Sequence, residues 1–260
     1  MLGLAALAGL GLGGAYALHG AGWDLSRLAR PGAYVEVDGR ALAVPRAEPS
    51  AGRLLPEVSA VTTGSHAFLH TGPDGAPVGY DPCRPVRYVV RTEGMPTAGQ
   101  MLIDEAVSIL SVATGLQFTP AGVTDEAPLV DRPLIQEDRY GPGWAPVLIA
   151  WSDETRMPEL AGQVAGVGGS AAVPGADGSG EWLAAGRVVL DTGDISRLLS
   201  APGGYEAARA VLVHELSHVV GLDHVEDRGE LMAPVTASRT DLGPGDRQGL
   251  ALLGQVACEG

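Results

Sequence analysis

From Asp81 onward, the apolar positions of the chain follow the repeats of short strands and amphipathic helices. Residues 86–90 (VRYVV) are rich in β-branched and aromatic side chains, which predicts a strand. Between Thr97 and Gly115 apolar residues recur at helical spacing, with Thr97 as the expected N-cap and Gly115 as the residue that ends the helix. The expected apolar stripe of this helix consists of Met101, Ile103, Ala106, Val107 and Leu110.

The later segments predict a mixture of strands and helices. Residues 146–151 are apolar throughout, which favours a central strand, and the Gly-rich run 164–173 suits an edge strand that another backbone approaches closely. Further strands are expected at 116–119 and 187–191, and helices at 205–220 and 244–253. Because the two types mix without strict alternation, we predict an α+β fold.

The N-terminal part of the chain has a different character. Residues 1–18 are uncharged and apolar, and three interpretations are open: a cleaved signal peptide, an uncleaved membrane anchor formed by residues 2–18, or a mis-assigned start. Each places the rest of the chain outside the cytoplasm. Residues 19–80 are interrupted by Gly and Pro and predict a linker or pro-region, with short strands at 34–37 and 41–44.

The overall charge limits the range of partners. The chain has 17 basic and 31 acidic residues, for a net charge of −14. A nucleic-acid partner is not expected, because phosphate binding needs a basic face. In an exported protein the two cysteines, Cys83 and Cys258, suggest a disulfide.

The segment 214–224 (HELSHVVGLDH) carries the chemistry of a metal site. His214 and His218 are four residues apart, so a helix presents both imidazoles on one face, where they can hold one Zn²⁺. Glu215 is placed to act as a general base, and Gly221 can end the helix in a turn that returns His224 as third ligand. Three protein ligands leave a fourth position open, as in catalytic zinc sites.

This segment resembles the HExxHxxGxxH signature of the metzincin metallopeptidases. Met232, in the segment 230–234 (ELMAP), is similar to the Met-turn of that clan and to its matrixin branch in particular. The resemblance implies a metzincin-like domain over residues 81–260. Its expected parts are a twisted, mostly parallel sheet with an antiparallel edge strand, an active-site helix, the Met-turn and a C-terminal helix.

The resemblance also implies a function. The expected protein is an extracellular zinc endopeptidase, secreted or anchored to the outer face of the membrane, that acts on protein or peptide substrates with Glu215 as general base. The substrate would add to the edge strand at 164–173, and Val235 and Thr236 would wall the main pocket. The alternatives are a tethered enzyme that processes one protein, and a catalytically silent relative that serves as a binding or adhesion module.

Other candidate sites are weaker. The remaining histidines, His19, His66 and His70, precede the domain, so a second zinc is not expected, and the last two are interpreted as surface residues. The loop 177–181 (DGSGE) could bind Ca²⁺, although a solvated turn is favoured. Cys83 is similar in place to the cysteine switch of matrixins, but the flanking residues differ and a disulfide with Cys258 is favoured.

Overall fold

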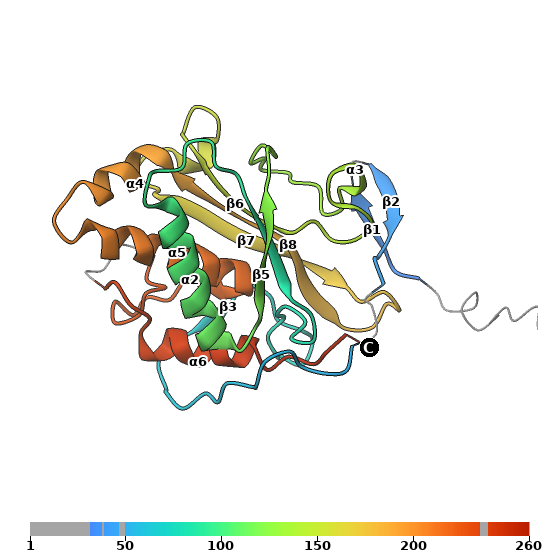
Figure 1. The fold of residues 1–260 in the computed structure, drawn as a ribbon. Coiled ribbons are helices and arrows are strands. Elements are labelled where there is room, and N and C mark those ends of the chain that lie inside the picture. Colours follow the sequence, from blue (N-terminus) through green and yellow to red (C-terminus); the bar gives the residue numbers. More distant parts are fainter. Residues whose placement is uncertain (1–31, 38, 47–49, 235–238, 260) are drawn as a thin grey trace, which may run out of the picture.

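The computed structural model describes residues 32–37, 39–46, 50–234 and 239–259 (Figure 1). The predicted signal or anchor segment, 1–18, therefore lies outside the described residues. Among the helices that are described, none has the length and apolarity needed to cross a membrane. The first described element is a hairpin of β1 (Tyr34–Val37) and β2 (Arg40–Ala43), at the place where two short strands are predicted.

The domain is built on one sheet of five strands in the order β5-β4-β6-β8-β7. The pairs β5–β4, β4–β6 and β6–β8 are parallel, and the edge strand β7 is antiparallel to β8. The prediction of a mostly parallel sheet with an antiparallel edge is confirmed. The strands are β4 (Val86–Val90), β5 (Phe118–Val123), β6 (Val147–Ser152), β7 (Gly166–Pro174) and β8 (Glu181–Asp191). Every residue of β6 is buried, as a central strand requires.

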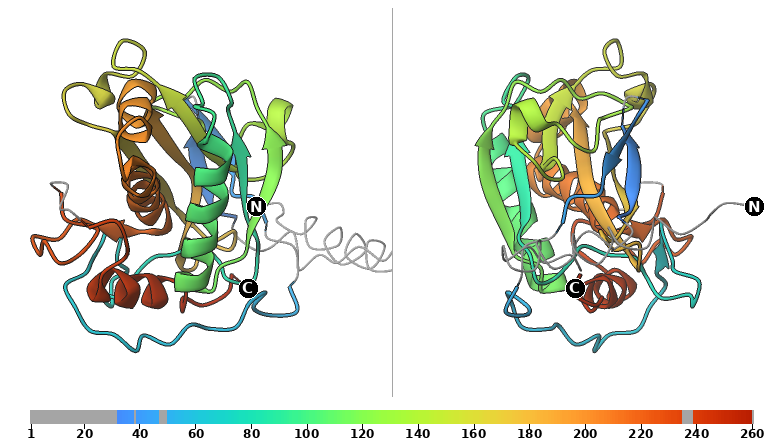
Figure 2. Two further views of the ribbon diagram at one scale, coloured as in Figure 1. Left: turned by 60° about the vertical axis from the view of Figure 1, so that its left-hand side comes forward. Right: turned by 90° about the vertical axis from the view of Figure 1, so that its right-hand side faces the viewer.

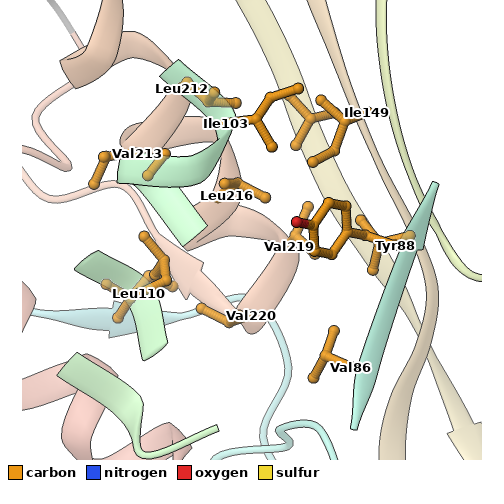
Figure 3. Close-up of a cluster of buried hydrophobic side chains, with 14 of the residues drawn as sticks. Val86, Tyr88, Ile103, Leu110, Ile149, Leu212, Val213, Leu216, Val219 and Val220 are labelled. Carbon is orange, nitrogen blue, oxygen red and sulfur yellow. The ribbon is translucent and has the colours of Figure 1, made fainter. Parts of the chain in front are cut away.

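Helices α2 (Gly99–Thr114) and α5 (Gly204–Val220) lie against one face of the sheet, and α6 (Pro244–Leu253) packs against both of these helices. Figure 3 shows Ile103 and Leu216, from α2 and α5, directed toward Tyr88 and Ile149 of the sheet. Leu110, also in this cluster, is fully buried. Truncating such a residue to Ala costs about 2–5 kcal/mol, so this interface dominates the stability of the domain.

Two details of the α2 prediction are wrong. The helix is flanked by Ala98, which makes no side-chain capping bond, so Thr97 is not the N-cap. Met101 is 53% exposed, and Leu102 is buried in its place. The buried face of α2 is the one that packs against the sheet and α5. This packing decides that Leu102, and not its neighbour Met101, points into the core. Gly115 does end the helix, with a φ of +71°.

The other face of the sheet is covered by the chain between β5 and β6, which includes the short helix α3 (Glu137–Tyr140). Alternate strand residues such as Val89 and Leu148 pack there. A buried ion pair organises this segment: Arg132 Nε donates to Glu126 Oε1 at 2.7 Å, and Arg132 Nη2 donates to the carbonyl of Pro146 at 2.8 Å. Burial alone would raise the pKa of Glu126, but hydrogen bonds from Arg132 and neighbours hold that pKa below its usual value.

Residues 53–72, which we call the strap, run along the outside of α6 (Figure 2). Arg53 Nη1 donates to the carbonyl of Gly254 at 2.7 Å, and Thr62 Oγ1 donates to that of Pro244 at 2.8 Å. Near its C-terminal end the strap contains β3 (Ala67–Phe68), which pairs with β9 (Leu222–Asp223). The sequence assigns this stretch to a linker or pro-region, and in the structure it is bonded to α6 and to β9.

The predicted disulfide is present. Cys83 and Cys258 are bonded, with their Cα atoms 5.6 Å apart, and Cys83 is buried. The bond joins the segment just ahead of β4 to the end of the chain after α6, so it closes the domain around the sheet. A cysteine switch at the histidines is therefore excluded for the bonded form.

Candidate metal centre

The last turns of α5 bring the first two predicted ligands together. His214 Nε2 and His218 Nε2 lie 3.1 Å apart. Gly221 then takes a φ of +116°, a conformation that L side chains rarely adopt, and its backbone N–H bonds back to Ser217 and His218. The chain turns through β9 and places His224 Nε2 3.1 Å from that of His214 and 3.2 Å from that of His218.

The hydrogen bonds of the two helical histidines determine their tautomers. His214 Nδ1 lies 2.8 Å from the carbonyl of Leu231, and His218 Nδ1 lies 2.8 Å from that of Leu222. A carbonyl oxygen can only accept, so each Nδ1 carries the proton and each Nε2 presents a lone pair. Burial lowers the pKa of both rings, that of His218 to about 4, so both are neutral at pH 7.

These facing lone pairs fit a bound cation. Without one, two acceptor nitrogens at 3.1 Å would repel each other. A tetrahedral ion with bonds of about 2.0–2.1 Å requires ligand nitrogens about 3.3 Å apart, close to the separations observed. Among the described residues, His214, His218 and His224 form a group that could hold a metal ion, and they line a cleft of about 590 Å³. The three histidines therefore suit a metal with an accessible remaining position.

Glu215 lies beside the first ligand and lines the same cleft. Its side chain is only 8% exposed, and burial raises its pKa to about 8 in the absence of a cation. A divalent ion nearby would favour the ionised form. The Glu215 carboxyl group therefore lies in the same cleft as the histidines, where it could act as a general base.

The edge strand β7 packs directly on the Glu215 turn of α5. A Cβ at Gly168 would come within 2.2 Å of the Glu215 carbonyl oxygen, and one at Gly166 within 2.9 Å of Glu215 Cγ. The expectation that these glycines permit the close approach of another backbone is confirmed, and the approaching backbone is that of α5. The edge strand is thereby held alongside the histidines.

The Met-turn is buried and bonded to the metal-site loop. Met232 is 1% exposed, and its carbonyl accepts from the N–H of Val225, the residue after the third histidine. The Leu231 N–H donates to Asp246 Oδ2 at 2.6 Å, and the Met232 N–H donates to Asp246 Oδ1 at 3.2 Å. Asp246, on α6, therefore holds the Met-turn in place, and the Leu231 carbonyl of this turn orients the His214 ring.

The sequence did not indicate the role of two acidic residues that hold the Met-turn and α6 together. Glu230 and Asp246 are each 1% exposed. Glu230 Oε2 accepts from the N–H groups of Gly245 and Asp246, at the N-terminus of α6, at 2.9 and 3.0 Å. An acidic residue in the first turn of the predicted helix 244–253 was the available signal, since carboxylates are favoured at helix N-termini.

The strap supports the third ligand from the other side. Phe68 pairs with Leu222 and Ala67 with Asp223, and the Leu69 N–H donates to the Gly221 carbonyl at 2.9 Å. The turn between Gly221 and His224 is therefore one strand of a small antiparallel pair. No local pattern in the sequence indicated this contact.

The remaining candidates do not join the site. His66 packs against Phe68 and close to Gly249, and it is not among the residues of the histidine group or of the cleft lining. Asp177 Oδ1 accepts from the N–H and hydroxyl of Ser179, which fits the solvated turn that the sequence favours over a Ca²⁺ site. Val235 and Thr236, the expected pocket wall, lie outside the described residues.

The fold and this histidine group define the class of protein: a metzincin-like α+β domain with a candidate catalytic metal centre. Residues 164–253 match the family model described as Matrixin. The matched region runs from the edge strand through α5 and the Met-turn to the end of α6. The predicted matrixin-like assignment is confirmed, and it supports a metallopeptidase hydrolase. No curated protein matches the chain.

Proposed function

We propose that this protein is a zinc-dependent endopeptidase of the matrixin type. The observation that carries the proposal is the convergence of three Nε2 atoms at 3.1–3.2 Å on a cleft that also contains Glu215. His214, His218 and His224 would hold the ion. Zinc at this position supplies Lewis-acid activation of a peptide carbonyl and of water.

Glu215 would move the protons of the reaction. A carboxylate at the cleft can accept a proton from the attacking water and deliver it to the leaving amine. Its partial enclosure by β7 excludes bulk water, which strengthens the electrostatic interactions of the site. Burial raises the pKa of Glu215 to about 8, and a cation bound nearby would favour the ionised form that accepts a proton.

The substrate would bind as an extended strand beside β7. Among the described strands β7 pairs only with β8, so its other edge is available for backbone hydrogen bonds to a peptide. The cleft is lined by residues 163–168 at this edge. Backbone recognition of this kind orders the scissile bond without demanding a particular side chain.

Export is part of the proposal. The apolar segment 1–18 precedes an acidic chain, and the disulfide between Cys83 and Cys258 is typical of oxidising compartments. We infer that the protein acts outside the cytoplasm, free or tethered by its N-terminal segment. Fractionation of cells that express the full chain, with the N-terminus of the exported form sequenced, would separate these two cases.

The decisive experiment compares the wild type with Glu215→Ala. We expect one zinc per chain in both proteins and cleavage of a peptide library only by the wild type. The matched control is Glu206→Ala, an exposed acid on the same helix, which should cut as the wild type does. Undiminished cleavage by Glu215→Ala would refute its role, and a zinc-loaded wild type that cuts nothing would favour the silent binding module.

A further inference from the structure

The cleft continues past the histidines into a side pocket. Leu198 of α4 (Thr192–Leu199) and Ala207, Ala210 and Val211 of α5 line this part. The side chains of the two alanines are small, so the wall leaves room for a substrate side chain of moderate size. Arg239 and Thr240 line the pocket from the segment that follows the Met-turn.

Arg239 differs from the other groups of this pocket in its unmet hydrogen-bonding capacity. Its Nε is enclosed and has no hydrogen-bond partner. Its Nη2 donates a long hydrogen bond to the Leu242 carbonyl, at 3.4 Å. No carboxylate among the described residues forms an ion pair with it, whereas Arg209, nearby on α5, is paired with both Glu105 and Asp241.

Two described carboxylates, Glu215 and Glu230, line the cleft, and neither forms an ion pair with Arg239. Glu230 accepts two N–H bonds at the N-terminus of α6, and Glu215 lies beside the metal ligands. In a chain with 31 acidic and 17 basic residues, an arginine left without an acidic partner is not explained by a shortage of carboxylates. The pocket therefore holds a cation for which the described residues provide no acidic partner.

We propose that this partner is the substrate: the pocket selects an Asp or Glu side chain directly beside the scissile bond. This inference rests on the proposed peptidase function. A carboxylate can satisfy the guanidinium with two parallel hydrogen bonds, while the methylene groups of Glu lie along Leu198 and Val211. An aliphatic side chain would fill the same walls but offer the guanidinium no acceptor, which selects against it.

The test uses the full-length, zinc-loaded protein and a peptide that the library experiment identifies as a substrate. At each residue that flanks the cut bond, Glu is replaced in turn by Gln, Leu and Lys. We expect kcat/KM for Glu to exceed that for Gln by at least about tenfold at one of the two positions, the range of a charged hydrogen bond. Arg239→Gln should abolish this preference, Arg239→Lys should keep part of it, and Arg239→Glu should shift it toward Lys.

A second measurement does not depend on turnover. Glu215→Ala, which leaves the peptide uncut, should bind the Glu peptide more tightly than the Gln peptide in fluorescence anisotropy, and the additional change Arg239→Gln should remove the difference. The matched control is Arg228→Gln, an exposed arginine near the site that does not line the pocket, and it should leave the preference intact.

The outcomes separate the two proposals. Failure of the wild type to cut any peptide would overturn the peptidase function itself. Cleavage without preference for an acidic neighbour, or a preference that survives Arg239→Gln in a protein with wild-type unfolding behaviour, would overturn the role of Arg239 alone. An equal loss of preference in Arg228→Gln would show that general surface charge is responsible and would also overturn it.

Discussion

Two segments determine the position of His224 in different ways. The first is the histidine segment, residues 214–232, which includes His224 and in which the contributing residues lie close together along the chain. The second is the strap, residues 53–72, which reaches the turn of His224 from about 150 residues away through the β3–β9 pair. The first segment supplies the ligands, and the second supplies hydrogen bonds that hold the turn of the last ligand.

The contrast shows that a local motif can specify the chemistry of a site without specifying its rigidity. The ring nitrogens converge because a helix and a glycine turn place them together. The precision of that turn, however, depends on the Leu69 bond to Gly221 and on the contacts of Gly64 and Ser65 with Gly245. Groups that support ligands in this way commonly change metal affinity by about 10–100-fold when they are removed.

The largest effect is expected from a change within the histidine segment. His218→Ala removes one of three ligands and should eliminate measurable zinc at equimolar metal, together with cleavage. Zinc content after dialysis, measured by mass spectrometry, checks this. His66→Ala is the control, since His66 belongs neither to the histidine group nor to the lining of the cleft, and its zinc content should match the wild type. Retention of stoichiometric zinc by His218→Ala would contradict the assigned ligand set.

Removal of the disulfide should affect stability and leave the site in place. Replacing Cys83 and Cys258 by Ala opens a loop of 175 residues, which should lower the free energy of unfolding by about 2–5 kcal/mol. Denaturant titration of the variant and the wild type measures the difference. At low denaturant both proteins should bind one zinc. Loss of zinc binding from a folded variant would show that the bond also shapes the metal centre.

A change at the contact between the strap and α6 tests the second support directly. Gly245→Ala should raise helix propensity by about 1 kcal/mol if the helix were isolated. In the protein its Cβ would lie 2.1 Å from the Ser65 carbonyl oxygen, so we expect a net destabilisation of about 1–3 kcal/mol.

The same Gly245→Ala protein should bind zinc about tenfold more weakly, because the displaced strap loosens the turn of His224. Competition with a chelator measures this affinity. An increase in stability with unchanged zinc affinity would mean that the strap does not support the site.

The smallest effect is expected from a single hydrogen bond of the strap. Thr62→Val keeps the shape of the side chain but removes the bond to the Pro244 carbonyl, at 2.8 Å. Because this bond is exposed, its loss should cost no more than about 1 kcal/mol, and zinc affinity should stay unchanged. Thermal unfolding of Thr62→Val and Gly245→Ala, each compared with the wild type, shows which variant is destabilised more. An effect of Thr62→Val as large as that of Gly245→Ala would mean that the strap is held by single bonds rather than by close packing.

Much of the fold could be predicted from local patterns. The apolar run of β6, the β-branched run of β4 and the glycine at the end of α2 each correspond to an element in the structure. Burial within α2 could not be predicted fully: Met101 and Leu102 are both apolar, and the packing of the helix in the core cluster buries Leu102. The short helices α3 and α4 were missed because so few residues carry no clear periodicity.

At the site, the sequence by itself determined the residues that could bind a metal, because helical spacing places His214 and His218 on one face and Gly221 can turn the chain toward His224. Tertiary structure alone decided which groups hold them. Asp246 and Glu230 bond to the Met-turn and to α6, and the strap pairs with the turn of His224. Arg239 lines the cleft with no acidic partner in the described part of the chain. These contacts join segments that are distant in the chain, and their partners are chosen by packing of the whole domain, which no local pattern encodes.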